Sequence, residues 1–123
     1  MADGQLLVDL LHLDGAGVLA VRGEIDAASA PMLREAVEHV EALGVPVVFD
    51  FAGVTFMAAS GLTVLIEASL RTGDAASVCV RNASEQVKRV LEITGLDSLI
   101  CAESHLPDVS TAHVSNVRSL DAS

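Results

Sequence analysis

The stretch "VPVVFDFAGVTFMAASGLTVL", residues 45–65, predicts a buried strand that leads directly into a helix. Its opening run, "VPVVFDF", is short and largely apolar, which is typical of a central strand covered on both faces of a sheet. From Ser60 onward, apolar residues recur at three- and four-residue spacings, and this places Leu62, Leu65 and Leu70 on one helical face. A strand that passes straight into a helix is the unit from which parallel α/β sheets are built.

The same alternation extends outward from this stretch in both directions. Residues 4–26 predict two extended runs joined by the turn-rich segment "LDGAG", which favours an antiparallel hairpin. Residues 28–44 repeat apolar side chains with helical spacing and end at a glycine. The downstream pattern predicts a strand at 76–82, a helix at 84–95, a strand at 98–102 and a final helix at about 107–120.

This order of elements predicts the fold class. Two strands followed by alternating helices and strands favour a mostly parallel sheet, because a crossover helix joins strands that run in the same direction. The 123 residues have room for one hydrophobic core, and no linker or internal repeat divides them. We therefore expect a single α/β domain over residues 1–123, in which an N-terminal β-hairpin precedes β-α units whose helices pack against the sheet.

Charge and composition exclude several classes of partner. The formal net charge is −10, aromatic residues are 2% of the chain, and Trp and Tyr are absent. Such a chain repels phosphate backbones and anionic lipid, and it lacks the aromatic side chains on which bases stack. No apolar run has the length that a membrane helix needs. We expect no nucleic acid and no membrane among its partners, and a basic protein surface fits the charge better.

Metal and cofactor chemistry has no recognisable motif in the sequence. The N-terminus lacks the basic segment of a signal peptide, so we expect a cytoplasmic protein. No Gly-rich phosphate loop follows a strand, and the four histidines are scattered over unrelated elements, so we expect no cofactor and no metal.

Cys79 and Cys101 are expected to be small buried hydrophobes in a reducing compartment. Because they fall on consecutive predicted strands, a redox-sensitive disulfide between them stays open as the alternative.

Ser60 allows two interpretations. Serine is among the preferred residues for capping a helix, so in the first interpretation its hydroxyl accepts a hydrogen bond from a first-turn amide. Met57, Ala58 and Ala59 are small or apolar, however, and they would surround an exposed hydroxyl with a neutral platform. A helix N-terminus also accommodates a phosphate well, because its unpaired amides and the helix dipole both favour negative charge. The second interpretation is therefore a modifiable serine that controls contact with a partner.

Two motifs in the chain are similar to those of one bacterial family. The first is "RGEIDAASAPMLREAV", residues 22–37, where that family has G-E-[LI]-D followed by a helix. The second is "VVFDFAGVTFMAASGLTVL", residues 47–65, where the family has D-[LF]-S-G, a phenylalanine and then [DS]-S-[ST]-G-L. On these motifs the chain resembles the STAS-domain anti-sigma factor antagonists. The resemblance covers about residues 5–105, which form the core of the domain and precede the predicted C-terminal helix.

The resemblance implies a partner-switching function without enzymatic activity. In that family the residue before Gly-Leu is the phosphoacceptor, which corresponds to Ser60, and the aspartate of G-E-[LI]-D, here Asp26, lies close to it. The implied partners are an anti-sigma factor, which is a serine kinase of ATPase fold, and a phosphatase that reverses the modification. The partner-binding residues would be Asp26, Met57, Ala58, Ala59, Gly61 and Leu62.

The chain departs from the family pattern beside the phosphoacceptor. Ala58 and Ala59 stand where acidic and hydroxyl residues are usual, and Ala52 replaces the serine of D-[LF]-S-G. Loss of the carboxylate at position 58 removes a hydrogen-bond acceptor from the loop. It implies either altered recognition by the kinase or an antagonist that is never switched off.

Two other functions remain as alternatives. One is a structural subunit of a multi-protein assembly such as a lipid-transport complex, where STAS-like domains also occur. The other is a small enzyme that uses Asp26 and Ser60. The sequence shows no recognisable general base for such an enzyme. Two residues also have ordinary structural explanations: Leu62 would be a core residue, and Asp26 would be a solvated carboxylate at a strand end.

Overall fold

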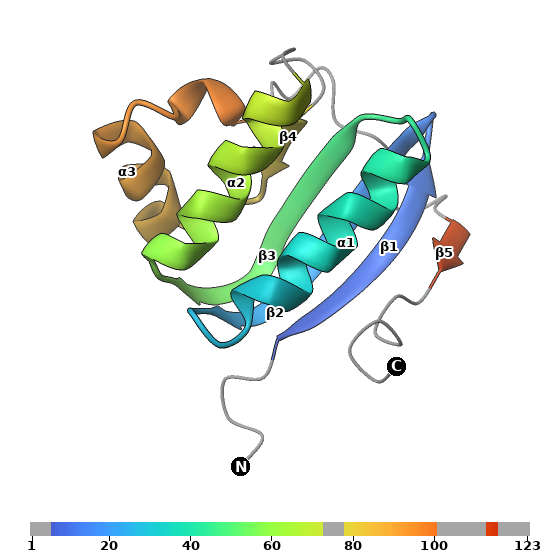
Figure 1. Cartoon of the computed structure of the whole chain (residues 1–123). Helices are drawn as coiled ribbons and strands as arrows, with labels where there is room; N and C mark the ends of the chain where they lie inside the picture. The colour runs from blue at the N-terminus through green and yellow to red at the C-terminus, as the bar shows by residue number, and fades with distance from the viewer. Residues whose placement is uncertain (1–5, 73–77, 101–112, 116–123) are drawn as a thin grey trace.

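The computed structural model describes residues 6–72, 78–100 and 113–115, and its sheet contains both antiparallel and parallel strand pairs. The strands lie in the order β4-β3-β2-β1-β5. β1 pairs antiparallel with β2 and with β5, whereas β2–β3 and β3–β4 are parallel pairs (Figure 1). The strands are β1 (Leu7–Leu13), β2 (Ala16–Ile25), β3 (Val47–Met57), β4 (Val78–Arg81) and β5 (His113–Ser115).

The N-terminal hairpin is confirmed, and its turn explains the "LDGAG" segment. β1 and β2 pair from Leu7↔Arg22 to Leu13↔Ala16, which leaves Asp14 and Gly15 as the turn. Both turn residues have positive φ angles, 47° and 80°. This is the combination for which Asp-Gly is favoured in a two-residue hairpin loop.

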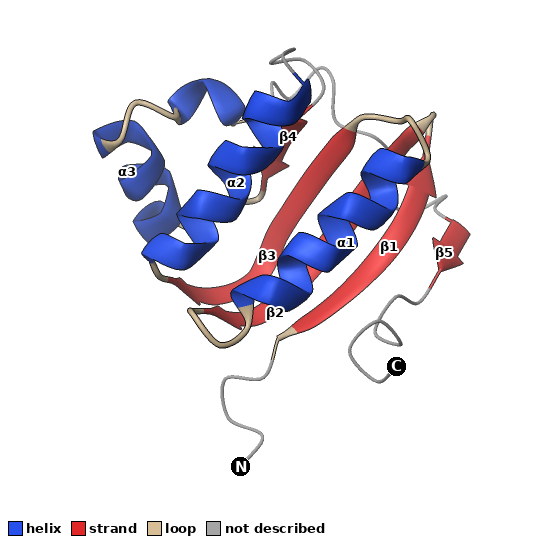
Figure 2. Ribbon diagram, viewed as in Figure 1, coloured by secondary structure: helices blue, strands red, loops and turns tan. Residues whose placement is uncertain are grey.

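Three helices alternate with the later strands, as the sequence predicts, and they pack beside one face of the sheet (Figure 2). They are α1 (Ala30–Ala42), α2 (Ala59–Thr72) and α3 (Glu85–Ile93). α1 has Pro31 in its first turn, a position that proline tolerates, and the chain leaves it through Gly44 at φ +72°. In the described part of the chain, no helix is both long and apolar enough to cross a bilayer.

The main hydrophobic core lies between the sheet and the three helices. Phe49 and Phe51 point into it from β3, with ring centroids 5.8 Å apart. A smaller cluster of buried residues on the opposite face of the sheet comprises Leu11, Leu13, Val18 and Val48. Burial on both faces explains why β3 begins as an uninterrupted apolar run.

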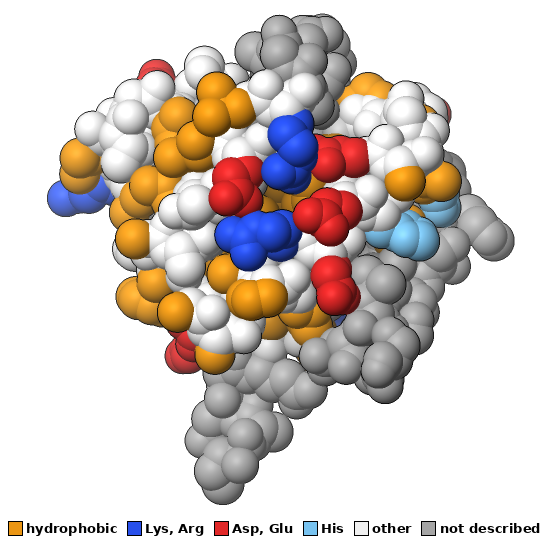
Figure 3. Space-filling view, viewed as in Figure 1, with side chains coloured by type: hydrophobic (Ala, Val, Ile, Leu, Met, Phe, Trp, Pro, Cys, Tyr) orange, Lys and Arg blue, Asp and Glu red, His pale blue; other side chains and the backbone are white. Residues whose placement is uncertain are grey.

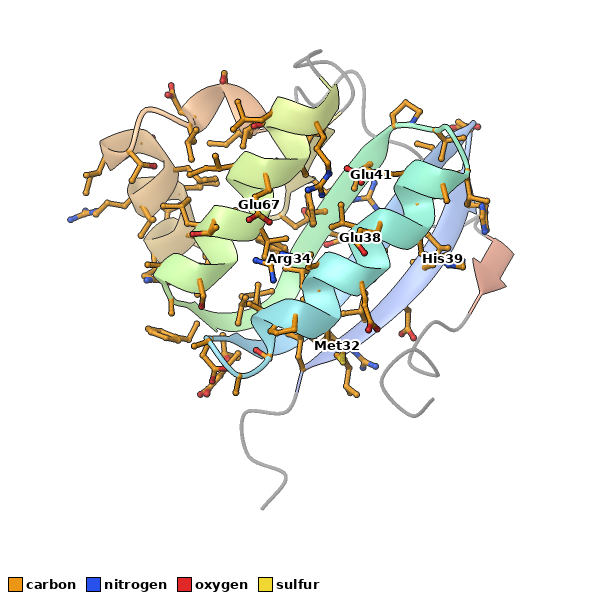
Figure 4. All side chains as sticks on the ribbon, viewed as in Figure 1. Met32, Arg34, Glu38, His39, Glu41 and Glu67 are labelled. Carbon is orange, nitrogen blue, oxygen red and sulfur yellow. The ribbon has the colours of Figure 1, made fainter. Side chains whose placement is uncertain are left out.

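Surface ion pairs connect α1 to α2. Arg34 Nε lies 2.9 Å from Glu67 Oε1, and Arg71 Nε lies 3.0 Å from Glu41 Oε1. Figure 4 shows Arg34 and Glu67 reaching toward each other between the two helices. Acidic and basic side chains are interleaved over this face (Figure 3), so it is not a basic patch of the kind that binds nucleic acid. Exposed pairs of this type contribute about 0–1 kcal/mol each, so apolar packing holds the helices in place.

The predictions for the C-terminal region were largely wrong where the structure describes it. Residues 98–102 were expected to form a strand, but Asp97–Leu99 is a 3₁₀ turn and Ile100 forms an isolated parallel bridge to Val80. Residues 113–115 were expected within a helix, but they form β5 and pair with β1. The remainder of the predicted helix, at 107–112 and 116–120, lies outside the described residues, as does Cys101.

The buried face of α2 differs from the predicted face. Val64, Leu65 and Ala68 are fully buried, whereas Leu70 is 74% exposed. Leu62 is partly buried and packs against the core. The apolar stripe is therefore rotated from the predicted one, because the first turn of α2 lies close to the sheet.

Candidate functional site

Two chain segments meet where the parallel strands β2 and β3 end. Ile25 and Met57, the last residues of these strands, are register partners. The Ala58 N–H donates to the Ile25 carbonyl at 2.8 Å, which ties the start of α2 to the segment that leads into α1. Figure 1 shows the β2–α1 connection and the beginning of α2 at the same end of the sheet. The structure thus brings together the two motifs that the sequence analysis selected.

Asp26 organises the connection from β2 to α1. Its Oδ1 accepts hydrogen bonds from the Ala28 N–H (3.1 Å), the Ser29 N–H (2.9 Å) and the Ser29 hydroxyl (3.0 Å). The Asp26 N–H donates in return to Ser29 Oγ at 3.0 Å. All of these bonds to the carboxylate use Oδ1, and within the described residues Oδ2 has no hydrogen-bond partner. Asp26 is therefore more than a solvated carboxylate, and Ser29 is a partner that the sequence analysis missed.

These hydrogen bonds make the Asp26 carboxylate a contributor to pH-dependent stability. The Ser29 N–H, followed by the Ser29 hydroxyl and the Ala28 N–H, lowers the Asp26 pKa from its ordinary value of 3.8. A lowered pKa stabilises the folded state at pH values above the ordinary aspartate pKa. This stabilisation is lost as the pH falls through the folded-state pKa.

We predict a pH-dependent effect for Asp26→Asn. The variant should be less stable than the wild type above about pH 5, and the difference should shrink as the pH falls below the ordinary aspartate pKa. Urea denaturation of both proteins at pH 7, 5, 4 and 3 measures this difference. A stability difference that stays constant over this range would show that the carboxylate charge is not responsible.

Ser60 does not cap α2, contrary to the first interpretation of the sequence. The helix begins at Ala59, and the Ala58 carbonyl accepts from the Gly61 and Leu62 N–H groups at 3.0 and 3.4 Å. Ala58 is thus the N-cap residue, and Ser60 is already helical. Its Oγ is buried and has no hydrogen-bond partner in the described part of the chain. The expected exposed hydroxyl is also wrong, because Oγ is turned inward while the residue as a whole is half-exposed.

We predict opposite stability effects for two serine-to-alanine substitutions. A buried hydroxyl without a partner costs about 1–3 kcal/mol, so Ser60→Ala should leave the free energy of unfolding unchanged or raise it by up to about 1 kcal/mol. Ser84 is the matched control, because its Oγ accepts from the Val87 N–H at 3.2 Å and caps α3. Ser84→Ala should lose about 1 kcal/mol. Urea denaturation that showed equal losses for both variants would restore Ser60 as a helix cap.

Gly61 brings the first turn of α2 against the ends of β2 and β3. A Cβ atom at this position would lie 2.6 Å from Ile25 Cγ2 and 2.7 Å from Met57 Cγ. Both neighbours are core residues, 0% and 4% exposed. Among the predicted partner-binding residues, Met57 therefore supports the loop from inside, and Gly61, also buried, fits it closely to the sheet. Ala59 is exposed, and Ala58 and Leu62 are half-buried.

Asp50, in the first half of the second motif, has a structural position away from this site. Its Oδ2 lies 3.2 Å from Nη2 of Arg81 on β4, and the Arg81 side chain is 3% exposed. Its Oδ1 accepts from the Ala52 N–H at 3.0 Å and from the Asn82 side-chain amide at 3.1 Å. This aspartate joins β3 to β4.

The described residues offer no set of three or more His, Cys, Asp or Glu side chains that could hold a metal ion. Cys79 is half-buried on β4 beside the smaller apolar cluster. Cys79 is disulfide-bonded, so the expectation of a free buried thiol is wrong for this residue. Its predicted redox partner, Cys101, lies outside the described residues, so the identity of the second cysteine stays a prediction.

Comparison with known proteins agrees with this geometry. The family model for the STAS domain matches residues 8–112. The chain belongs to the STAS-domain family. An anti-sigma-F factor antagonist, RsfB of Mycobacterium tuberculosis, is 30% identical over 89% of this chain and 91% of its own length. The anti-sigma-B factor antagonist of Listeria monocytogenes is 36% identical over 75% of this chain and 79% of its own length.

One solved structure is similar to this chain in both fold and sequence. The crystal structure of an anti-sigma factor antagonist from Mycobacterium paratuberculosis superposes with a TM-score of 0.71 and is 30% identical. It covers 79% of this chain and 84% of its own. The expected α/β fold and the resemblance to the antagonists of this family are thus confirmed.

Proposed function

We propose that this STAS domain is an anti-sigma factor antagonist that binds an anti-sigma factor of ATPase-like serine kinase fold and thereby releases a sigma factor. In this proposal the kinase phosphorylates Ser60, which ends the binding, and a phosphatase restores it. The relatives named above support the general role. One observation carries the switch: the Ser60 hydroxyl caps nothing and, within the described residues, bonds to nothing, so it has no structural explanation.

The first turn of α2 is suited to carry a phosphate. In the described part of the chain, the Ala59 and Ser60 N–H groups have no acceptor, which is usual for the first amides of a helix. These amides and the helix dipole favour a negative group of about −1.5 to −2 charges. Because Oγ is buried, the Ser60 side chain must rotate to another staggered rotamer before a kinase can reach it.

The surroundings of Ser60 explain why a phosphate would end partner binding. Ala58 and Ala59 present no charge, so the surface that a partner covers is neutral at its centre. Asp26 and the exposed Glu24 are negative and lie at the neighbouring strand end. A phosphate would place a bulky, strongly hydrated charge at this neutral centre, where a partner complementary to the unmodified surface offers no counter-charge, so the cost of desolvating it would end the binding.

The test combines modification and binding. The protein is isolated from the cytoplasm of its native host, where sigma factors act. Its intact mass is measured, and its peptides over residues 50–71 are mapped. We expect a fraction with one phosphate on Ser60, and we expect the unmodified fraction alone to capture an ATP-binding kinase. If no phosphate occurs under any growth condition, Ser60 is not a switch. Capture of a membrane transporter's ATPase instead would favour a structural subunit of an assembly such as a lipid-transport complex.

A further inference from the structure

Phe56 is the only exposed aromatic residue of the chain. The sequence contains three phenylalanines and no Trp or Tyr. Phe49 and Phe51 are 0% and 1% exposed, whereas Phe56 is 46% exposed. A single exposed apolar side chain is ordinary, but Phe56 is the one aromatic ring of the chain that lies outside the core.

A β-bulge in β3 turns Phe56 outward. On β2, the consecutive residues Gly23 and Glu24 pair with Val54 and Phe56, so Thr55 is an extra residue on β3. Side chains alternate between the faces of a strand, so in a regular strand without a bulge Phe56, two residues after Val54, would share its core-facing side. The bulge reverses this order, because Met57 enters the core at 4% exposure and Phe56 leaves it.

The bulge is held by the neighbouring strand. Thr55 Oγ1 donates to the Gly23 carbonyl at 3.3 Å, and the pairing resumes with Glu24 opposite Phe56. Bulges are frequent beside functional sites, where they re-aim a side chain. The exposure of Phe56 is therefore built into the backbone of β3.

Phe56 lies close in the chain to the segment that carries Ser60. It lies two residues before Ala58, whose N–H bonds to Ile25, and Glu24 beside it is exposed. An aromatic side chain next to carboxylates matches a partner surface with an apolar pocket and a basic rim. Aromatic residues of this kind frequently supply most of the binding energy of an interface.

We propose that Phe56 is the hydrophobic anchor of the interface with the anti-sigma factor, where it enters an apolar pocket edged by basic groups that face Glu24 and Asp26. This inference rests on the proposed function and adds a residue to it. Phe56 replaces Met57 as the apolar contact of the loop, because Met57 belongs to the core.

The test measures the affinity of the full chain for the anti-sigma factor of its native host by calorimetry. Phe56→Ala should weaken binding by roughly tenfold or more, and Phe56→Leu, which keeps part of the apolar surface, should lose less. Leu70→Ala is the matched control, because Leu70 is 74% exposed and lies near the other end of α2. Its affinity should equal that of the wild type, and circular dichroism should show all variants folded.

The possible failures are distinguishable. If the wild type does not bind the anti-sigma factor, the proposed function is wrong and the anchor falls with it. If the wild type binds and Phe56→Ala binds equally well, the function stands and the anchor is wrong. Sedimentation tests another occupant: a wild-type dimer that Phe56→Ala dissociates would assign Phe56 to contact between two copies of the chain and overturn the proposal.

Discussion

Replacing Ser60 with glutamate is expected to weaken binding to the anti-sigma factor by roughly 100-fold or more. The substitution places a permanent negative charge in the first turn of α2, between the neutral Ala58–Ala59 platform and the acidic Asp26 segment. A charge buried at an interface without a counter-charge costs several kcal/mol, and about 1.4 kcal/mol corresponds to tenfold in affinity. Calorimetry with the purified partner measures the loss directly.

The position of the charge, and not its presence, should decide this result. Leu70→Glu adds the same charge to the same helix, ten residues further on, which is about 15 Å along the helix axis. Leu70 is 74% exposed, so the control is not expected to disturb packing. It should bind within about twofold of the wild type at physiological salt, because the Debye length there is about 8 Å. Equal losses in both variants would show general repulsion by net charge and would remove the switch from Ser60.

The N-terminal hairpin and the β-α units that follow it could be predicted because their signals are local. Apolar runs on β3 and β4, helical spacing on α1 and α3, and Asp14-Gly15 in the hairpin turn each point to the structure observed. The C-terminal region has no such signal. β5 is three residues long and exists through its pairing with β1, a partner about a hundred residues away in the sequence. A strand defined by a distant neighbour cannot be identified from its own residues.

The sequence indicated which segments make up the candidate site but not their geometry. Asp26 and the loop before Gly61 stand out in the sequence, and the Ala58–Ile25 hydrogen bond ties these two segments together. Predictions are wrong where a shift of one residue changes which face of a strand a side chain occupies or where a helix begins. The extra residue Thr55 exchanges the faces of Phe56 and Met57, and a helix that begins at Ala59 turns Ser60 from a cap into a helical residue. Helix boundaries and strand register depend on tertiary contacts, so single-residue shifts of this kind are not visible in the sequence.

Gly61→Ala is expected to destabilise the protein by about 2 kcal/mol, although alanine is the better helix former. The propensity gain is at most about 1 kcal/mol. Against it, the new Cβ would meet Ile25 Cγ2 and Met57 Cγ at 2.6 and 2.7 Å, and neither atom is the free end of a flexible side chain. Overpacking a well-filled core costs about 1–3 kcal/mol, and here the displaced side chains are also the strand ends that carry the site. Urea denaturation should therefore give a lower midpoint for the variant.

Thr63→Ala separates this packing effect from helix propensity. Thr63 is exposed in the next turn, so its replacement raises helix propensity without filling core space, and we expect a stability change within about 0.5 kcal/mol of zero. A neutral or stabilising Gly61→Ala would mean that α2 can move away from Ile25 and Met57 at little cost. If the close approach matters for function, the same variant should also lose affinity for the anti-sigma factor while remaining folded. That loss would arise because the first turn of α2, with Ser60 in it, could no longer lie beside the Asp26 segment at the end of the sheet.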